Sequence, residues 1–342
     1  MNYKKLGNTD LKVSTICLGT MTWGEQNTQQ EGFQQMDYAL DQGVNLWDTA
    51  EIYSVPPKPE TFGHTEIILG NWFKKTKKRD KVILATKVSG PGLSWIRGGG
   101  LQYTKKNISI AIEGSLKRLQ TDYIDVYQLH WPDRPMSMFG SGGIGYKHIE
   151  SESISINETL GVLSDLVKNG KIRYVGLSNE TPWGLSEFLK YSEMNNLPRV
   201  VSVQNAYNFL NRTYEQGMSE YFHRSQVGLL AYSPLAQGYL TGKYIDGARP
   251  EGSRTALFER GDRYEVPGAN EAIKSYVAYA DLIGLDPSVM ANAFVNSRDF
   301  VTSNIIGATT MEQLKLAVGS IEVNLDDENL KAIEEIHRSN PN

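Results

Sequence analysis

The sequence predicts a (β/α)8 TIM barrel with an N-terminal β-hairpin and a C-terminal helix. Short runs of β-branched and apolar residues alternate with longer segments of helical periodicity, which is the pattern of βαβ units. Eight such strand and helix pairs can be counted, and no linker rich in Ser, Pro or charge divides residues 1–342. We therefore expect one barrel domain over the whole chain.

Each predicted strand is a short apolar run, and each predicted helix carries apolar residues at helical spacing. Strands are expected at 15–19, 45–50, 82–87, 124–130, 172–177, 200–204, 227–232 and 300–306. Helices are expected at 32–42, 65–75, 106–119, 156–169, 183–194, 214–224, 270–283 and 310–318, with a terminal helix at 326–337. Residues 3–13 have the pattern of a hairpin with a Gly-Asn-Thr-Asp turn, which would close the lower end of the barrel.

An open doubly wound sheet is the main alternative fold. It would be expected to carry a glycine-rich dinucleotide turn after its first strand, and the sequence has none there. Three connections, at 90–105, 132–155 and 236–270, exceed the usual few residues. All three follow the ends of predicted strands, so we expect them to gather over one mouth of the barrel.

Composition narrows the class of protein. The formal net charge of -4 offers no broad basic face for nucleic acid or for an anionic membrane surface. Cys17 is the only cysteine, which excludes intramolecular disulfides and suits a reducing compartment. The polar N-terminal residues do not resemble a signal peptide, and no apolar run reaches transmembrane length. We expect a cytoplasmic protein.

Four polar residues stand at or just beyond the ends of predicted strands. Asp48, Lys87 and His130 each close an apolar run, and Tyr53 lies on the loop that follows the first of these runs. Active sites of parallel barrels are built at strand C-termini, so these side chains are expected to share one pocket. Asp48 would keep a buried Lys87 charged, and that cation would favour the phenolate of Tyr53.

His130 could form a hydrogen bond with a substrate oxygen or share the proton with Tyr53, and the four residues would then form a proton-donating site for a carbonyl. Each residue alone has a simpler structural explanation, as a cap, a packed loop residue, a strand-end cation or a core histidine. Their joint appearance at the ends of three consecutive βα units favours the functional interpretation. With five histidines and no paired ligand spacing, the sequence gives no support for a metal site.

Candidate cofactor residues follow the later strands. Amide and hydroxyl groups of Ser178, Asn179 and Gln204 could hold a nicotinamide carboxamide. The segment 232–238 offers an aromatic face and a flexible loop for a pyrophosphate, with Lys243 and Arg254 as phosphate partners. The segment 307–310 opens a helix whose N-terminal amides could bind phosphate, although Ser, Thr and Gly at helix starts usually indicate ordinary capping.

The motifs Trp47-Asp-Thr-Ala-Glu-Ile-Tyr53, Ala85-Thr-Lys87 and Leu129-His130 resemble the tetrad segments of the aldo-keto reductases. The likeness continues through 171–179, 232–235 and 305–308 in the order that the family shows. Within the family, the segments 130–135 and 233–235 favour the branch with the bacterial Tas-type proteins and the potassium-channel β-subunits. The resemblance implies NADP(H) and reversible hydride transfer to an aldehyde or ketone, with Tyr53 as the acid.

The resemblance also implies roles for the cofactor residues. Ser178, Asn179 and Gln204 would hold the carboxamide, Tyr232 would stack on the nicotinamide ring, and Asp48 would border it. The expected cofactor contacts beyond these are Thr20, Met21, Ser233, Pro234, Leu235, Ala236, Gly238, Lys243, Arg254, Gly307, Thr309 and Gln313.

One departure from the family pattern concerns the adenine end. Many relatives carry Glu-Asn late in the last cofactor helix, where this chain has Leu316-Ala317, so weaker adenine contacts are expected. Thr309, Gln313 and Arg254 are the candidates for the 2′-phosphate, and NADP is favoured over NAD.

Two other functions stay open at this point. The channel β-subunit branch shows that such a fold can serve as a cofactor-binding regulatory module with little turnover. A lysine that ends a barrel strand could also form a Schiff base in a lyase, with Lys87 as nucleophile, although a nearby Asp48 would oppose that role. The physiological carbonyl substrate and the oligomeric state cannot be predicted from the sequence.

Overall fold

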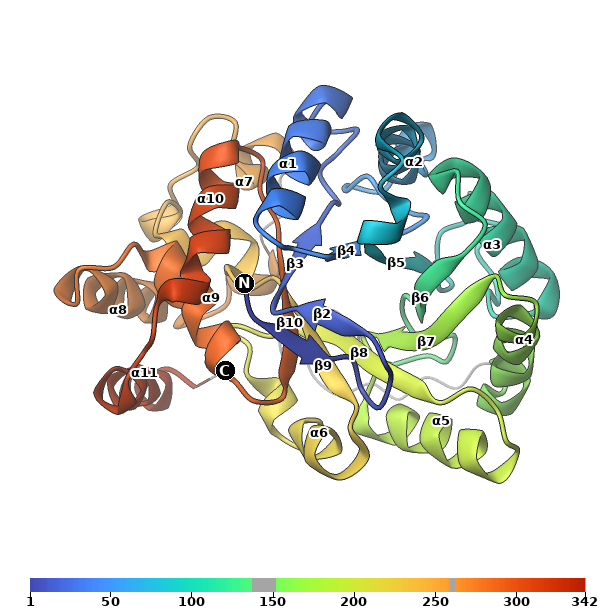
Figure 1. Cartoon of the computed structure of the whole chain (residues 1–342). Coiled ribbons are helices and arrows are strands. Elements are labelled where there is room, and N and C mark those ends of the chain that lie inside the picture. Colours follow the sequence, from blue (N-terminus) through green and yellow to red (C-terminus); the bar gives the residue numbers. More distant parts are fainter. Residues whose placement is uncertain (137–151, 259–261, 342) are drawn as a thin grey trace.

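The computed structural model describes residues 1–136, 152–258 and 262–341, and its centre is a closed barrel of parallel strands (Figure 1). Neighbouring strands pair in chain order, and β10 closes the ring on β3 with Ile305 opposite Cys17. The predicted (β/α)8 fold is confirmed. The barrel strands are β3 (Ile16–Gly19), β4 (Leu46–Asp48), β5 (Ile83–Val88), β6 (Ile124–Leu129), β7 (Ile172–Ser178), β8 (Val200–Ala206), β9 (Gly228–Tyr232) and β10 (Val301–Ile306).

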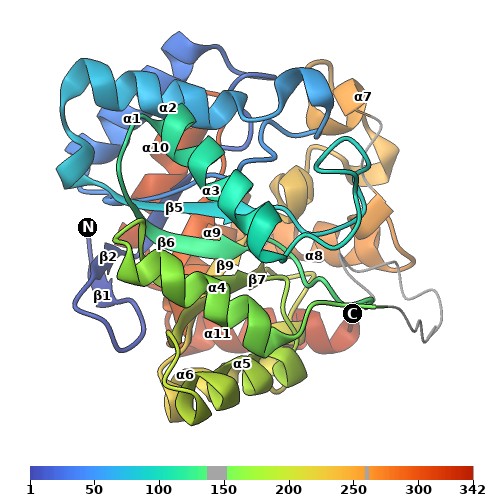
Figure 2. The same ribbon diagram turned by 90° about the vertical axis from the view of Figure 1, so that its right-hand side faces the viewer.

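Helices surround the strands on all sides (Figures 1 and 2). Side chains of Ser, Thr or Asp cap many of their N-termini, as Thr28 caps the first helix in a reciprocal capping box with Glu31. The helices are α1 (Gln29–Asp41), α2 (His64–Thr76), α3 (Lys105–Leu119), α4 (Ile156–Lys168), α5 (Pro182–Met194), α6 (Ser219–Ser225), α7 (Arg254–Phe258), α8 (Ala269–Leu282), α9 (Pro287–Ser297), α10 (Met311–Gly319) and α11 (Asp327–Ser339).

An antiparallel hairpin lies across one end of the barrel (Figure 1). It consists of β1 (Tyr3–Lys5) and β2 (Lys12–Ser14). Its buried residues Leu6, Leu11 and Val13 form one apolar cluster with inward residues of the barrel strands, such as Val126 and Leu230. The hairpin therefore closes this end with apolar side chains and leaves the opposite, C-terminal end of the strands for polar groups.

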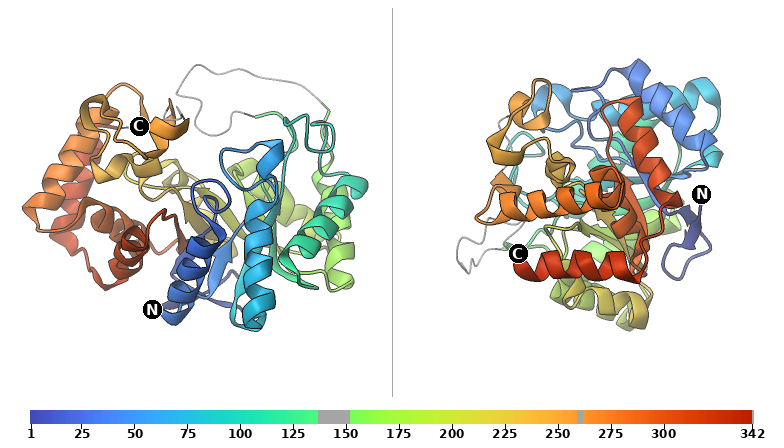
Figure 3. Two further views of the ribbon diagram at one scale, coloured as in Figure 1. Left: turned by 90° about the horizontal axis from the view of Figure 1, so that it is seen from above. Right: turned by 90° about the vertical axis from the view of Figure 1, so that its left-hand side faces the viewer.

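The structure differs from the prediction in two helical regions. The helix predicted at 214–224 is a short 3₁₀ turn at Thr213–Glu215 followed by α6, because Gly217 lies between them with φ 87°. Helix α9 was not predicted, and Figure 3 shows it within the group of orange and red helices α8 to α11 on one side of the barrel. Asp286 caps α9 and Pro287 begins it, a start signal that sequence reasoning overlooked.

Among the described residues, no helix combines the length and the apolar character needed to cross a membrane. Of the three long connections, 90–105 is described throughout and 236–270 in large part, whereas most of 132–155 lies outside the described residues.

Close packing of α2 on α3 depends on a glycine. A Cβ atom at Gly70 would lie 2.1 Å from the carbonyl oxygen of Arg118 in α3. We expect Gly70→Ala to destabilise the protein by about 1–3 kcal/mol through backbone displacement. In Gly161→Ala, on α4, the new Cβ meets nothing within 4 Å, so this matched variant should be neutral or more stable by roughly 0.5–1 kcal/mol. Urea unfolding of both variants checks this, and equal midpoints would contradict it.

Candidate active site

The barrel brings all four predicted tetrad residues together at the C-terminal end of its strands. Asp48 is the last residue of β4, Lys87 lies in β5, and His130 directly follows β6. Tyr53 lies on the loop after β4 and turns back toward Lys87, with its ring edge-on to His130 at a centroid distance of 5.8 Å. Adjacent strands thus supply the polar groups, as in other parallel barrels.

A buried ion pair joins β4 to β5. Lys87 Nζ donates to Asp48 Oδ2 at 2.6 Å and to the carbonyl oxygen of Thr49 at 2.8 Å. The Lys87 side chain is fully shielded from solvent, and that of Asp48 is 4% exposed. Burial alone would lower the pKa of Lys87, but the Asp48 carboxylate and Tyr53 together raise it above its ordinary value. Lys87 is therefore a cation at neutral pH.

Tyr53 lies close enough to Lys87 for the cation to affect the pKa of its phenol. Lys87 Nζ lies 3.4 Å from the Tyr53 hydroxyl oxygen and 4.9 Å from the centre of its ring. The sequence argument expected Lys87 to favour the phenolate. Lys87 does lower the pKa of Tyr53, and Arg254 adds to this effect, but burial of the phenol is the larger influence and raises the pKa above its ordinary value. Tyr53 is therefore a protonated phenol at neutral pH.

His130 is neutral in this environment. Its Nδ1 is shielded from solvent and has no hydrogen-bond partner among the described residues. Burial, and secondarily the charge of Lys87, hold the pKa of the His130 imidazole well below its ordinary value. A neutral imidazole can donate or accept one hydrogen bond at a substrate oxygen.

Two glutamine amides complete the surroundings of Asp48. Gln204, two residues before the end of β8, donates through Nε2 to Asp48 Oδ1 at 2.8 Å, and Gln128, in β6, donates to the same oxygen at 3.0 Å. Gln128 was not among the predicted site residues. Its position two residues before His130 was the available signal, because alternate residues of a barrel strand face the interior.

The residues expected to hold a carboxamide lie side by side at the mouth. Asn179 Nδ2 donates to the carbonyl oxygen of His130 at 2.9 Å, and the Ser178 hydroxyl donates to the carbonyl oxygen of Gln204 at 2.9 Å. The Tyr232 hydroxyl donates to Asn179 Oδ1 at 2.7 Å, which fixes the aromatic ring beside these groups. Asn179 and Tyr232 also line a cavity of about 250 Å³.

The backbone after β9 follows an unusual path. Ser233, Ala236 and Gln237 all have φ between 47° and 59°, a left-handed conformation that non-glycine residues rarely adopt. Such conformations concentrate at binding and catalytic sites, where the fold enforces them. The loop continues through Pro234 and Leu235 to Gly238, at which a Cβ would lie 3.1 Å from the Cε atom of Lys243. The Lys243 side chain thus packs against this loop, which we expected from the sequence to bind a pyrophosphate.

The other predicted cofactor residues lie in three places: after β3, after β10 and at the start of α7. Thr20 and Met21 follow β3, and the Thr20 hydroxyl donates to the carbonyl oxygen of Asp48 at 2.8 Å. Gly307 follows β10, and Thr309 donates through its amide and its hydroxyl to Gln313 Oε1 at 2.9 and 3.1 Å. Arg254 begins α7, where its charge reaches Tyr53.

Comparison with known proteins agrees with this geometry. The sequence profile described as "Aldo/keto reductase family" matches residues 15–338. The chain belongs to the aldo/keto reductase family. Over 341 residues it is 46% identical to Protein tas of Escherichia coli strain K12, covering 99% of this chain and 98% of that protein. It is 34% identical over 343 residues to "Uncharacterized oxidoreductase YrpG" of Bacillus subtilis strain 168, with 98% and 96% covered.

A third relative is the "Aldo-keto reductase" of Babesia bovis, which is 40% identical over 250 residues and covers 69% of this chain and 87% of that protein. The predicted resemblance to the Tas-type branch is confirmed, and the chain is an oxidoreductase of this family.

A second buried ion pair fixes a wall of this aldo/keto reductase's site. Glu51, 1% exposed and between Asp48 and Tyr53 in sequence, accepts two hydrogen bonds from the Arg97 guanidinium at 2.5 and 2.9 Å and one from the Ser89 amide at 2.7 Å. Arg97 belongs to the long loop 90–105. Sequence reasoning missed this pair, which ties the loop to the segment carrying Tyr53. The neighbouring apolar cluster contains Ala50, Ile52, Tyr53, Phe62, Leu93, Trp95, Ile96 and Trp131.

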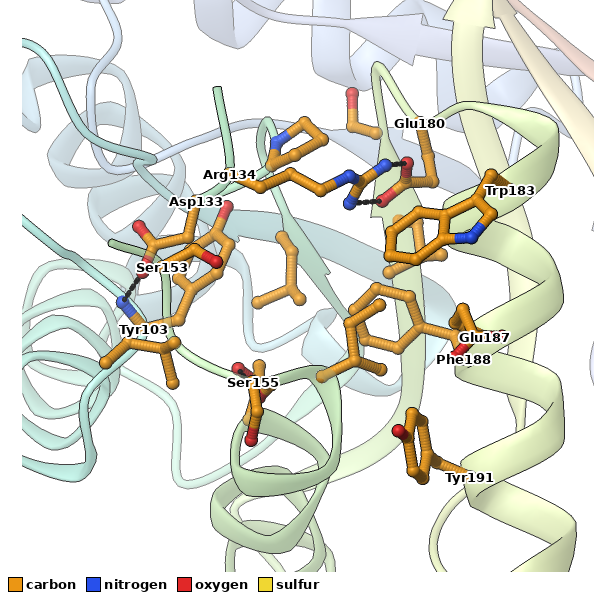
Figure 4. A pocket seen from close by; sticks show the side chains of 17 residues that line it. Tyr103, Asp133, Arg134, Ser153, Ser155, Glu180, Trp183, Glu187, Phe188 and Tyr191 are labelled. Atoms are coloured by element: carbon orange, nitrogen blue, oxygen red, sulfur yellow. Dashed lines mark hydrogen bonds and ion pairs between the residues drawn. The ribbon is translucent and has the colours of Figure 1, made fainter. Parts of the chain in front are cut away.

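Figure 4 shows another cavity of this reductase, with a volume of about 230 Å³. It is lined by Phe188 and Tyr191 of α5 and by Asp133 and Arg134, and Arg134 pairs with Glu180 at its rim. It lies between the strands and the outer helices and contains none of the tetrad residues, so we do not count it as part of the candidate active site. Within the described residues, no group of three or more His, Cys, Asp or Glu side chains could hold a metal ion.

The depressed pKa of His130 predicts a pH-dependent stability. Below an unfolded-state pKa of about 6.5 the unfolded chain takes up a proton that folded His130 resists. Stability therefore falls as the pH drops, by up to about 1.4 kcal/mol per pH unit for this group. In His130→Gln no imidazole is present, so this pH dependence should be absent. As the pH is lowered from about 7 to about 5, the free energy of unfolding of the variant should therefore increase relative to that of the wild type. Chemical denaturation at several pH values checks this, and parallel curves would contradict it.

Proposed function

We propose that this oxidoreductase catalyses reversible hydride transfer between NADP(H) and the carbonyl of an aldehyde or ketone, with Tyr53 as general acid. The observation that carries the proposal is the contact of Lys87 Nζ with both the Asp48 carboxylate and the Tyr53 hydroxyl, beside a neutral His130. When bound, the reduced nicotinamide would supply the hydride. Tyr53 would give its proton to the carbonyl oxygen, which becomes the alcohol oxygen.

The charges around Tyr53 support its proposed role as the proton donor. The phenol is protonated in the free site, so a proton is available for a reduced carbonyl. Lys87 stabilises the phenolate that remains after transfer, and Asp48 keeps Lys87 charged. His130 is close enough to the Tyr53 ring to orient the carbonyl oxygen by a hydrogen bond.

The residues present fit a nicotinamide dinucleotide. Among the described residues no donor reaches Gln204 Oε1, so this oxygen can accept a hydrogen bond from a carboxamide. The backbone of the loop after β9 is held in left-handed conformations by the protein itself, which suits a preformed binding loop. We propose that Ser178 and Asn179 join Gln204 at the carboxamide, that Tyr232 stacks on the ring, and that Lys243 meets the pyrophosphate. Arg254, Thr309 and Gln313 remain our candidates for the 2′-phosphate.

We further propose that residues 1–342 act as one domain, in the cytoplasm, on a small carbonyl compound and without nucleic acid or membrane partners. The negative net charge and the single cysteine support this. The Schiff-base alternative is disfavoured, because a Lys87 amine held charged by Asp48 at 2.6 Å is a poor nucleophile.

The acid role of Tyr53 makes a direct prediction. Tyr53→Phe should lower NADPH-dependent reduction of an aldehyde by about 10²–10⁴-fold, because the hydroxyl proton is lost, and should leave NADPH binding intact. Absorbance decay and NADPH fluorescence report the two effects. Tyr276→Phe is a matched control, since the Tyr276 hydroxyl is buried and has no hydrogen-bond partner among the described residues. Full turnover by Tyr53→Phe would exclude the proposed acid.

A second prediction concerns the pyrophosphate. Lys243→Gln should weaken binding of NADPH and NADH alike, by roughly tenfold, because one charge-assisted contact to a common group is lost. Fluorescence titration of both nucleotides measures this. Lys331→Gln, which removes the same charge from an exposed position on α11, should leave both affinities unchanged. An unchanged affinity in Lys243→Gln would place the pyrophosphate elsewhere.

A further inference from the structure

Gln128 is a polar side chain in a place that barrels usually fill with branched apolar residues. It is the fifth of the six residues of β6, is fully buried, and stands in strand register with Lys87 of β5 and Gly176 of β7. A buried amide is costly unless its hydrogen-bonding groups are satisfied. The contacts that satisfy Gln128 therefore indicate why an amide is tolerated at this depth.

Both polar atoms of Gln128 face the Asp48 network. Its Nε2 donates to Asp48 Oδ1 at 3.0 Å, and its Oε1 accepts from Gln204 Nε2 at 3.2 Å. Because an ionised carboxylate only accepts hydrogen bonds, the nitrogen of each amide must point toward Asp48. The two oxygens of Asp48 are thus divided, with Oδ2 on Lys87 and Oδ1 on the two amides.

The barrel makes room for this side chain. A Cβ atom at Gly176 would lie 3.0 Å from Cγ of Gln128 and 3.1 Å from the Ser202 hydroxyl oxygen, so the absence of a side chain on β7 leaves the space that Gln128 fills. Gln204 has a second proposed duty at the nicotinamide carboxamide. Gln128 is therefore the amide that is dedicated to Asp48.

We propose that Gln128 is a positioning residue for the proton donor, acting through Asp48: it holds Oδ1 so that Oδ2 stays on Lys87, and its amide dipole offsets part of the Asp48 charge at Tyr53. This inference rests on the proposed role of Tyr53 as the acid. Among the described residues, the charged groups that act on Tyr53 are Lys87 from β5, Asp48 from β4 and Arg254 from α7. The imidazole of His130 packs against its ring, and Tyr232 of β9 is a further titratable neighbour, whose own pKa Tyr53 raises.

The expected sign follows from these charges. Asp48 raises the pKa of Tyr53 by repelling the phenolate, whereas Lys87 and Arg254 lower it. In Gln128→Met the side chain keeps its length but donates nothing, so the carboxylate repels the phenolate more strongly. The pKa of Tyr53 should rise by roughly 0.5 unit or more.

The pKa can be measured without turnover. In protein that carries 3-fluorotyrosine, whose phenol is more acidic, ¹⁹F NMR follows each tyrosine with pH, and the resonance missing from Tyr53→Phe identifies residue 53. The control is Ser202→Ala, since Ser202 is a buried neighbour in the same layer whose hydroxyl has no hydrogen-bond partner among the described residues. Ser202→Ala should leave the Tyr53 titration where it is in the wild type.

A double-mutant cycle with Asp48→Asn tests the route of the effect. Once residue 48 is neutral, Gln128→Met should no longer move the Tyr53 titration, and if the Met variant fails to fold, Gln128→Leu serves in its place. Three results would overturn the inference. The pKa of Tyr53 could stay unchanged in the Gln128 variant, it could shift only as much as in Ser202→Ala, or its shift could persist in the presence of Asp48→Asn.

Activity separates this inference from the proposed function. In alcohol oxidation with NADP⁺, the rising limb of the pH profile should move upward in Gln128→Met by the same amount as the NMR titration. If the wild type oxidises no alcohol but the NMR shift is present, the reductase proposal fails and the positioning of Tyr53 by Gln128 stands. If the wild type turns over and the limb does not move, the positioning role fails alone.

Discussion

The buried ion pair between Lys87 and Asp48 is the interaction on which the rest of the site depends. Burying either charge alone carries a large desolvation cost. Each is tolerated because the opposite charge lies 2.6 Å away and further hydrogen bonds surround the pair. Removing one partner of such a pair typically costs about 3–5 kcal/mol, because the other charge is left buried alone. The pair therefore constrains both strands, and the side chains that touch it are constrained in turn.

Two sets of contacts spread from this pair. Toward the mouth, Lys87 reaches the Tyr53 hydroxyl, so the proposed acid senses the cation directly. Inside the barrel, Asp48 accepts hydrogen bonds from the amides of Gln128 and Gln204, so the polar network extends from β4 and β5 to β6 and β8. The hairpin at the opposite end contributes apolar residues instead, which keeps the polar network at the C-terminal face.

Sequence reasoning could predict that Asp48, Tyr53, Lys87 and His130 lie together, because the signal for this clustering is local. A polar residue that ends an apolar strand has few places to go other than the mouth, and Asp48, Lys87 and His130 all carry that signal. Gln128 and Glu51 could not be found in this way. The role of Gln128 depends on which residues of β6 face the barrel interior, and the role of Glu51 depends on its partner Arg97, which is 46 residues away in the sequence. The break at Gly217 was also missed, because a helical apolar pattern continues across it.

The direction of the Tyr53 pKa shift could not be predicted either, since it is a balance between a nearby cation and burial that no sequence spacing encodes. In the free site burial prevails, and the two formal charges of the ion pair cancel beside a neutral His130. In the proposed mechanism Tyr53 carries the proton that is transferred, and the charge of Arg254 is a further cation that acts on it. A carbonyl oxygen that gains negative charge on reduction would then find Tyr53 as the acid and Lys87 as the cation that stabilises the phenolate left behind, and both depend on Asp48 being held in place.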